Sequence, residues 1–126
     1  DGDDLIQGGA DADVIRGGAG NDIIRFGAAD QGHDQIFGDA GFDTIEALVQ
    51  ADGRAFVLAS QITDVERITG AAGATRTIIQ TGTEADGIGR TLVLGDIQLQ
   101  NVTDLQGGGG NDVLGGSTNA NNAATA

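Results

Sequence analysis

Acidic side chains recur at a fixed distance from apolar ones along the first third of the chain. Each of five Asp residues stands two places before an Ile, and a sixth stands two places before a Leu; these are Asp4, Asp13, Asp22, Asp34, Asp43 and Asp112. The first five are spaced by 9, 9, 12 and 9 residues. Carboxylate oxygens are the ligands that hard divalent cations prefer. A row of carboxylates at a fixed period therefore predicts repeated cation sites.

Glycine-rich stretches precede these Asp residues, most fully in the nonapeptide of residues 17–25, Gly-Gly-Ala-Gly-Asn-Asp-Ile-Ile-Arg. Gly reaches positive φ without strain and lets carbonyl oxygens converge on one point. The candidate ligands from these turns are Gly2, Gly9, Gly18, Gly20, Gly32 and Gly41, together with Asp11, which stands where a Gly is expected. One three-residue insertion near 26–28 interrupts the period, and a single late copy spans 107–115.

The last three positions of each nonapeptide predict a short strand, on which alternate side chains face opposite sides. If two nonapeptides complete one coil, Ile6 stacks with Ile24 and Ile45 on one sheet, and Ile15 stacks with Ile36 on the other. A fixed period of this kind is the signature of a solenoid. The predicted fold is all-β, a solenoid of parallel strands with cations in its turns, which continues into less regular, metal-free β rungs.

The spacing of stacked coils suits calcium. Neighbouring strands lie about 4.8 Å apart, and an ion held at about 2.4 Å from oxygens on both sides spans roughly the same distance. The predicted pairs are Asp4 with Asp22, Asp13 with Asp34, and Asp22 with Asp43. Two carboxylates at about 4.8 Å repel by about 1 to 3.5 kcal/mol between water-like and intermediate dielectric. About three ions would change the net charge of −13 to −7, and binding should drive folding.

Composition narrows the classes of function. The net charge of −13 argues against nucleic acid or an anionic membrane as a partner and invites cations. No apolar stretch approaches the roughly 20 residues of a membrane span, so direct membrane insertion is not expected. The chain has no Cys, and His33 is its only histidine. Because so few catalytic side chain types are present, an enzyme is not expected, and His33 is interpreted as an exposed turn residue.

At these glycines and aspartates the sequence resembles the RTX (repeats-in-toxin) family of calcium-binding nonapeptide repeats. The resemblance covers residues 1–46 and 107–115. It implies a β-roll whose Asp carboxylates and turn carbonyls bind calcium, in bacterial proteins that are exported and fold outside the cell or at its surface. Departures occur at Asp11, at Asp39 and in the segment 29–31, which makes the Asp13–Asp34 site the least regular. Asp112 is expected to be a weaker ligand.

Four regions are predicted along the chain: the calcium-binding roll (1–46), degenerate rungs or linker (47–106), an isolated repeat (107–116) and a small polar tail (117–126). Within the second region, short strands are expected at 55–58, 77–79, 91–94 and 96–100. The segment 62–70 is interpreted as a linker between repeat blocks, and 73–78 as a decayed copy. Residues 98–106 form a candidate rung with Thr103 at the ligand position.

The leading hypothesis is a calcium-binding structural module of a secreted bacterial protein. Leu5, Val14 and Ile23 should face outward, either as plain strand residues or as an apolar stripe that contacts another chain. Arg16 and Arg25 are expected in surface ion pairs. Two alternatives remain open: a self-assembling surface-layer or adhesin unit that contacts copies of itself, and an accessory module beside neighbouring domains of a secreted polysaccharide-active enzyme or protease.

Overall fold

A computed structural model describes residues 1–27, 32–80, 91–107 and 113–117 of the chain. All regular structure in these residues is β-strand. The described ranges contain no helix long and apolar enough to cross a membrane. The prediction of an all-β chain is therefore confirmed.

Twelve strands follow one another through the described residues. They are β1 (Leu5–Ile6), β2 (Val14–Ala19), β3 (Ile23–Phe26), β4 (Asp34–Ala40), β5 (Thr44–Ala47), β6 (Arg54–Thr63), β7 (Arg67–Gly70), β8 (Arg76–Gln80), β9 (Thr91–Gly95), β10 (Gln98–Gln100), β11 (Asp104–Gln106) and β12 (Val113–Ser117). One sheet has the order β1-β3-β5-β7-β10 and a second has the order β11-β8-β6-β4-β2. Strands β9 and β12 pair with each other.

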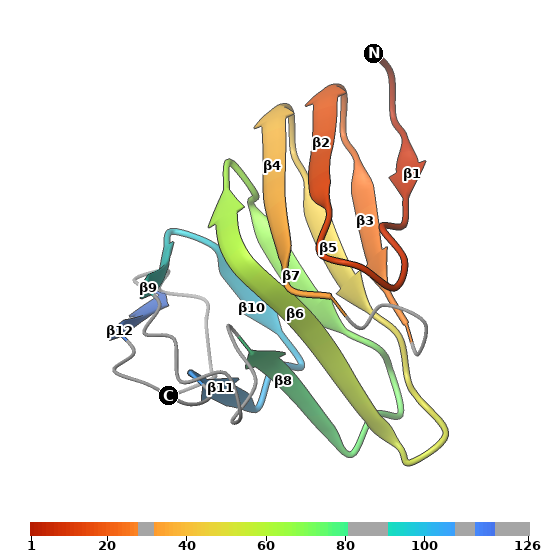
Figure 1. Cartoon of the computed structure of the whole chain (residues 1–126), viewed down its shortest axis with the longest axis vertical. Helices are drawn as coiled ribbons and strands as arrows, with labels where there is room; N and C mark the ends of the chain where they lie inside the picture. The colour runs from red at the N-terminus through yellow and green to blue at the C-terminus, as the bar shows by residue number, and fades with distance from the viewer. Residues whose placement is uncertain (28–31, 81–90, 108–112, 118–126) are drawn as a thin grey trace.

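From β1 to β8 the chain alternates between the two large sheets, so each coil contributes one strand to each. The strand pairs are parallel throughout the described residues. Figure 1 shows the two sheets as two layers, with β1 at one end and β9 to β12 at the other. The chain therefore winds as a parallel β-roll.

The register of the strands confirms the predicted Ile stacks. Ile6 pairs with Ile24 and Ile24 with Ile45 in the first sheet, and Ile15 pairs with Ile36 in the second. Ile24, Ile36 and Ile45 have no exposed surface. Burial of a β-branched side chain of this size stabilises the fold by about 1.5–3 kcal/mol. The Ile ladder is therefore the core that holds the two sheets together.

The segment 62–70 was predicted to be a linker, and this is wrong. Residues Arg67–Gly70 form β7, which lies between β5 and β10 in the first sheet. Ile68 is fully buried and continues the ladder from Ile45 to Leu99. The roll thus continues beyond the glycine-rich repeats. The boundaries of the four predicted regions stay a prediction.

The side chains expected to face outward do so, although they do not make one stripe. Leu5 and Ile23 are neighbours on the first sheet and are 60% and 39% exposed. Val14 is exposed too, but it lies on the second sheet, beside Gln35. The exposed apolar surface is therefore divided between the two faces of the roll.

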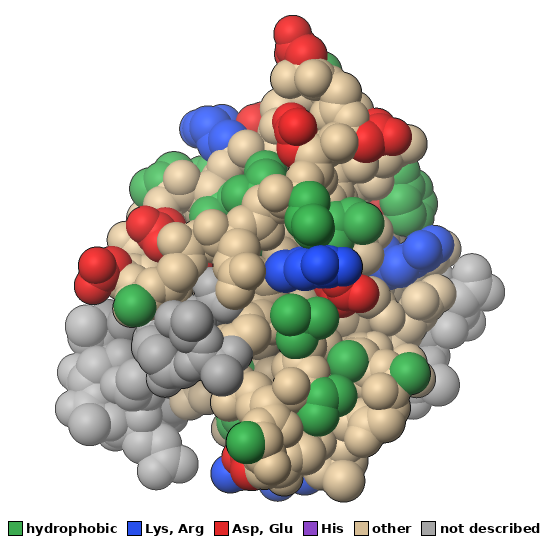
Figure 2. Space-filling view, turned by 90° about the vertical axis from the view of Figure 1, so that its right-hand side faces the viewer, with side chains coloured by type: hydrophobic (Ala, Val, Ile, Leu, Met, Phe, Trp, Pro, Cys, Tyr) green, Lys and Arg blue, Asp and Glu red, His purple; other side chains and the backbone are tan. Residues whose placement is uncertain are grey.

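The predicted surface ion pairs are present. Arg16 lies 3.2 Å from the Asp39 carboxylate and stacks over the Phe37 ring. Arg25 donates to Glu46 at 2.6 Å. Figure 2 shows basic side chains lying between acidic and apolar ones on the outer surface. Exposed pairs of this kind contribute little to stability.

Candidate metal site

The acidic side chains gather at the two edges of the roll, where the chain passes from one sheet to the other. The turns that lead into β1, β3 and β5 carry Asp4, Asp22 and Asp43. The turns that lead into β2 and β4 carry Asp13 and Asp34. The predicted pairing of alternate copies therefore holds, because each pair belongs to successive coils at one edge.

A hydrogen-bond ladder joins the paired acids. The backbone N–H of Asp4 donates to Asp22 Oδ1 at 2.8 Å, and the N–H of Asp22 donates to Asp43 Oδ1 at 2.8 Å. At the other edge, the N–H of Asp13 donates to Asp34 Oδ1 at 2.8 Å. Each of these bonds uses one oxygen of the carboxylate and fixes its orientation. At Asp22 and Asp43 the second oxygen, Oδ2, has no hydrogen-bond partner among the described residues.

That second oxygen is buried at Asp22. The Asp22 side chain is 1% exposed, and its Oδ2 has no hydrogen-bond partner among the described residues. A methyl group built on Gly17 would contact Asp22 Oδ2 and would lie 2.7 Å from the carbonyl oxygen of Gly38 in the next coil. A carboxylate oxygen and a carbonyl oxygen thus both approach Gly17 so closely that only a glycine fits between them.

A buried carboxylate oxygen without a donor is costly unless a cation or a proton compensates it. The hard oxygen donors at Asp22 and Gly38 match calcium or magnesium, and the roll brings them from two coils, as predicted. No three His, Cys, Asp or Glu side chains of the described residues converge closely enough to hold an ion by themselves. An ion here must therefore take part of its ligands from backbone carbonyls.

The other edge brings Asp13 and Asp34 together in a similar way. A methyl group on Gly8 would lie 3.1 Å from Asp13 Oδ2 and 3.2 Å from Asp34 Oδ2. Gly32 packs against the carbonyl oxygen of Asp11, so the main chain of the earlier turn faces the later one. The Asp11 side chain is exposed. Asp11 is therefore placed to contribute its carbonyl oxygen.

Five of the six predicted turn glycines, all except Gly32, have the conformation that the sequence predicted. Gly2, Gly9, Gly18, Gly20 and Gly41 all have positive φ. Gly20 and Gly41 also stack closely on their predecessors, because a side chain on either would collide with the carbonyl oxygen of Gly2 or Gly20. Asp39, which replaces a glycine, keeps the left-handed conformation at φ 70°.

Electrostatics at the turns favour a bound cation. Burial raises the pKa of the Asp43 carboxyl above its ordinary value, and the Asp22 N–H opposes this shift. The nearby carboxylates of Asp22, Glu66 and Asp39 also raise the Asp43 pKa. A divalent ion would remove this penalty, since it supplies the missing positive charge.

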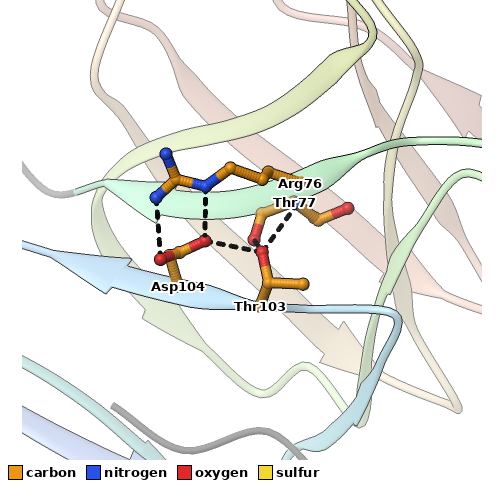
Figure 3. Close-up of polar contacts among 4 residues, drawn as sticks. All are labelled: Arg76, Thr77, Thr103 and Asp104. Atoms are coloured by element: carbon orange, nitrogen blue, oxygen red, sulfur yellow. Dashed lines mark hydrogen bonds and ion pairs between the residues drawn. The ribbon is translucent and has the colours of Figure 1, made fainter.

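Beyond the acidic turns, an uncharged Thr side chain accepts the same kind of hydrogen bond from the main chain of a neighbouring coil. The N–H of Thr77 donates to Thr103 Oγ1 at 3.1 Å, as Figure 3 shows. Arg76 donates to both oxygens of Asp104, at 2.8 and 3.1 Å, and the Thr103 hydroxyl donates to the same carboxylate at 2.6 Å. Thr103 thus occupies the predicted ligand position in a turn whose neighbouring carboxylate already has a cationic partner.

A family model described as the RTX calcium-binding nonapeptide repeat, with four copies, matches residues 1–30, 29–52 and 104–121. These residues make up more than half of the chain. The chain belongs to the RTX calcium-binding repeat family. Searches of curated proteins and of solved structures gave no match. Its RTX repeats coincide with the acidic turns at both edges of the roll, so the chain carries a calcium-binding β-roll of the RTX type.

The structure also brings in residues that the sequence reasoning missed. Glu66 Oε2 accepts the N–H of Asp43 at 2.7 Å and so takes the place of the next Asp. Asp3 and Asn21 form a second ladder, in which they accept the N–H groups of Asn21 and Phe42 at 2.7 and 2.8 Å. The sequence does contain a signal for Glu66. It stands two places before Ile68, which is the spacing of Asp before Ile in the repeats.

Two expectations about single residues have different outcomes. His33 is half-buried rather than exposed, and its carbonyl oxygen accepts the Ser60 hydroxyl at 3.3 Å where β6 packs beside β4. Asp112 lies outside the described residues, so its expected role as a weaker ligand stays a prediction.

Proposed function

We propose that this chain is a structural module of a secreted protein, which folds as calcium enters its turns outside the cell. The ligands in this proposal are carboxylates of Asp4, Asp13, Asp22, Asp34 and Asp43, with turn carbonyls beside them. Asp22 Oδ2 supports it most directly, because this buried oxygen lies against a carbonyl of the next coil and lacks a donor within the described structure. About three ions would occupy these turns.

When bound, calcium supplies positive charge and joins oxygen ligands of successive coils. The chain's own residues do the positioning: the Ile ladder sets the distance between coils, and N–H bonds to Oδ1 orient the carboxylates of Asp22, Asp34 and Asp43. Without calcium, the acids repel one another in a chain of net charge −13. The proposed product of binding is a rigid rod, with no catalytic role.

Circular dichroism of the purified chain in calcium and in chelator tests this proposal. We expect β-sheet signal in calcium, loss of most of it in chelator, and recovery when calcium is restored. Magnesium at the same concentration is the matched control, because its smaller size and stricter octahedral geometry fit these turns poorly. Identical spectra with and without calcium would count against folding on binding.

A second function, self-assembly at a cell surface, is favoured by one observation. Leu5 and Ile23 are exposed next to each other on the first sheet, and paired apolar side chains of this kind suit contact with another chain. Sedimentation velocity and electron microscopy after calcium addition separate the two candidates. Sheets or filaments that disappear in a Leu5→Ser, Ile23→Ser variant would support assembly, and a calcium-bound monomer would support the solitary module.

A further inference from the structure

We propose a further calcium site between the Asp43 turn, which lies in a segment that matches the repeat family, and the Glu66 turn, which lies outside the matched segments. The proposal rests on the calcium-binding function proposed above and extends it to a turn that has no glycine. It assigns Glu66 and the main chain of Asp64 as ligands that face Asp43. The site would join the last repeat of the first block to the irregular rungs that follow.

The geometry at Gly38 repeats the geometry at Gly17. A methyl group on Gly17 would meet Asp22 Oδ2 and the carbonyl oxygen of Gly38. A methyl group on Gly38 would lie 2.5 Å from Asp43 Oδ2 and would contact the carbonyl oxygen of Asp64. The same three elements recur one coil later: a closely packed glycine, a carboxylate oxygen of the same turn, and a carbonyl oxygen of the next turn. Asp64 occupies in this turn the position that Gly38 occupies in the preceding turn.

The carboxylate at this place is fully buried. Asp43 has no exposed surface, and its Oδ2 has no hydrogen-bond partner in the described part of the chain. Its Oδ1 already accepts the N–H of Asp22, so the carboxylate cannot swing away without breaking that bond. An oxygen held in this way, beside the Asp64 carbonyl, is placed to bind a cation.

Glu66 brings the second acid. Its Oε2 accepts the N–H of Asp43 at 2.7 Å, as Asp43 itself accepts the N–H of Asp22. The Glu66 side chain is half-buried and is one methylene longer than Asp, so it spans the distance from a shorter turn. The column of acids at this edge therefore continues through four coils, as Asp4, Asp22, Asp43 and Glu66.

The turn from Asp64 to Glu66 brings Glu66 into this column of acids although the turn contains no glycine. Asp64 adopts the left-handed conformation, at φ 51°, in which Asp is one of the few tolerated side chains. Val65 is 5% exposed and anchors the turn in the core. The N–H groups of Glu66 and Arg67 both donate to the Asp43 carbonyl at 3.1 Å. These bonds hold the turn so that the Asp64 carbonyl faces Gly38.

A hollow next to this turn gives solvent access to Glu66. It has a volume of about 470 Å³, and Asp64, Glu66 and Asp96 contribute to its lining. Calcium takes six to eight oxygen ligands and accepts water among them, so an open side suits a site with fewer protein ligands. The proposed ion would tie β5 to β7 and thereby extend the calcium-bound part of the roll into the irregular rungs.

The test compares Glu66→Gln with wild type and with Glu46→Gln. Gln keeps an oxygen for the Asp43 N–H and removes the charge, and Glu46 is an acid of the same roll that pairs with Arg25 on the outer face. Calorimetric calcium titration of the full chain should show one site weakened about tenfold or more in Glu66→Gln, since calcium affinity follows ligand charge. Glu46→Gln should bind as wild type does.

Calcium binding by Glu66→Gln with unchanged number and affinity of sites would overturn this site and leave the proposed function intact. Absence of calcium binding by the wild-type chain would overturn both. A second measurement needs no variant: amide shifts of residues 64–66 in the wild-type NMR spectrum should titrate with calcium together with those of residues 38–43. Shifts confined to residues 1–43 would also overturn the Glu66 site.

Discussion

The turns at Asp22 and Asp43 and the turns at Thr77 and Thr103 use the same hydrogen bond from the main chain of one coil to a side chain of the next. They differ in charge. The acidic turns leave a buried carboxylate oxygen with no donor among the described residues, whereas the carboxylate beside Thr103 is paired with Arg76. The same roll is therefore built with charged or with uncharged side chains at one position of the repeat, and the proposed cation sites are confined to the charged turns.

The largest effect on this contrast is expected for the substitution Asp22→Asn. The amide keeps an acceptor for the Asp4 N–H but removes a charge that borders two of the proposed sites. We expect the calcium affinity of both sites to fall about tenfold or more, because ligand charge sets calcium affinity. Calorimetric titration measures the change. Asp52→Asn is the control, since Asp52 is exposed and accepts the N–H of Arg54 in a turn outside the ladder.

Acidification should change the contributions of Asp43 and Asp104 to stability in opposite directions. The pKa of Asp43 is raised in the fold by burial, so in chelator its contribution to stability is greatest at acid pH and is lost as pH rises through the raised pKa. Calcium needs the ionised carboxylate, so calcium affinity should fall as pH drops through the same range. Calcium titrations at a series of pH values test this, and affinity independent of pH would contradict it.

Asp104 should behave in the opposite way. Hydrogen bonds from Arg76 and Thr103 lower the pKa of this carboxyl below its ordinary value. Its contribution to stability is therefore present above the ordinary pKa and is lost as pH falls through the lowered value. Asp104→Asn should remove this acid-side loss without changing calcium affinity. Denaturant unfolding of both proteins across the acid range, in saturating calcium, measures the difference.

Thr103→Val tests the uncharged ladder directly. Valine preserves the shape and removes the acceptor for the Thr77 N–H, which is partly buried. We expect a loss of about 1–3 kcal/mol in the free energy of unfolding and no change in calcium affinity. Urea unfolding in saturating calcium and calorimetry together measure this, and a weakened calcium site would show that the two regions are not independent.

The smallest effect is expected for Arg76→Gln. The Arg76 side chain is about half exposed, at 48%, so its ion pair with Asp104 is screened by solvent and salt. Stability should fall less than in Thr103→Val, and the loss should shrink as salt is added. Calcium binding should be unchanged, and a salt-independent loss larger than that of Thr103→Val would contradict this assignment.

Periodicity explains why much of the roll was predictable. The nine-residue spacing determines which Ile residues stack and which Asp residues share an edge, and both follow from strand geometry alone. The pairs Ile24–Ile45 and Asp22–Asp43 therefore needed no tertiary information. The positive φ of Gly18 and Gly20 followed from the repeat for the same reason.

The prediction failed where the turn changed length. Residues 62–69 lack glycine, and their regular conformation depends on Asp64 adopting a left-handed φ and on Val65 packing into the core. Neither can be read from local composition. Glu66 departs from the repeat because it is a Glu on a turn without glycine, although it accepts the same backbone hydrogen bond as the repeat Asp residues. The partial burial of His33 could not be predicted, since its neighbour Ser60 is far along the chain.

Hydrogen exchange of the full chain in calcium and in chelator tests the central claim most directly, because it reports on each turn separately. The account predicts that amides of β2 to β5 are protected in calcium and exchange rapidly in chelator. Amides of β8 and β11, in the uncharged ladder, should change much less. Equal protection of β2 to β5 in both conditions would contradict the claim that a cation compensates the buried acids of this roll.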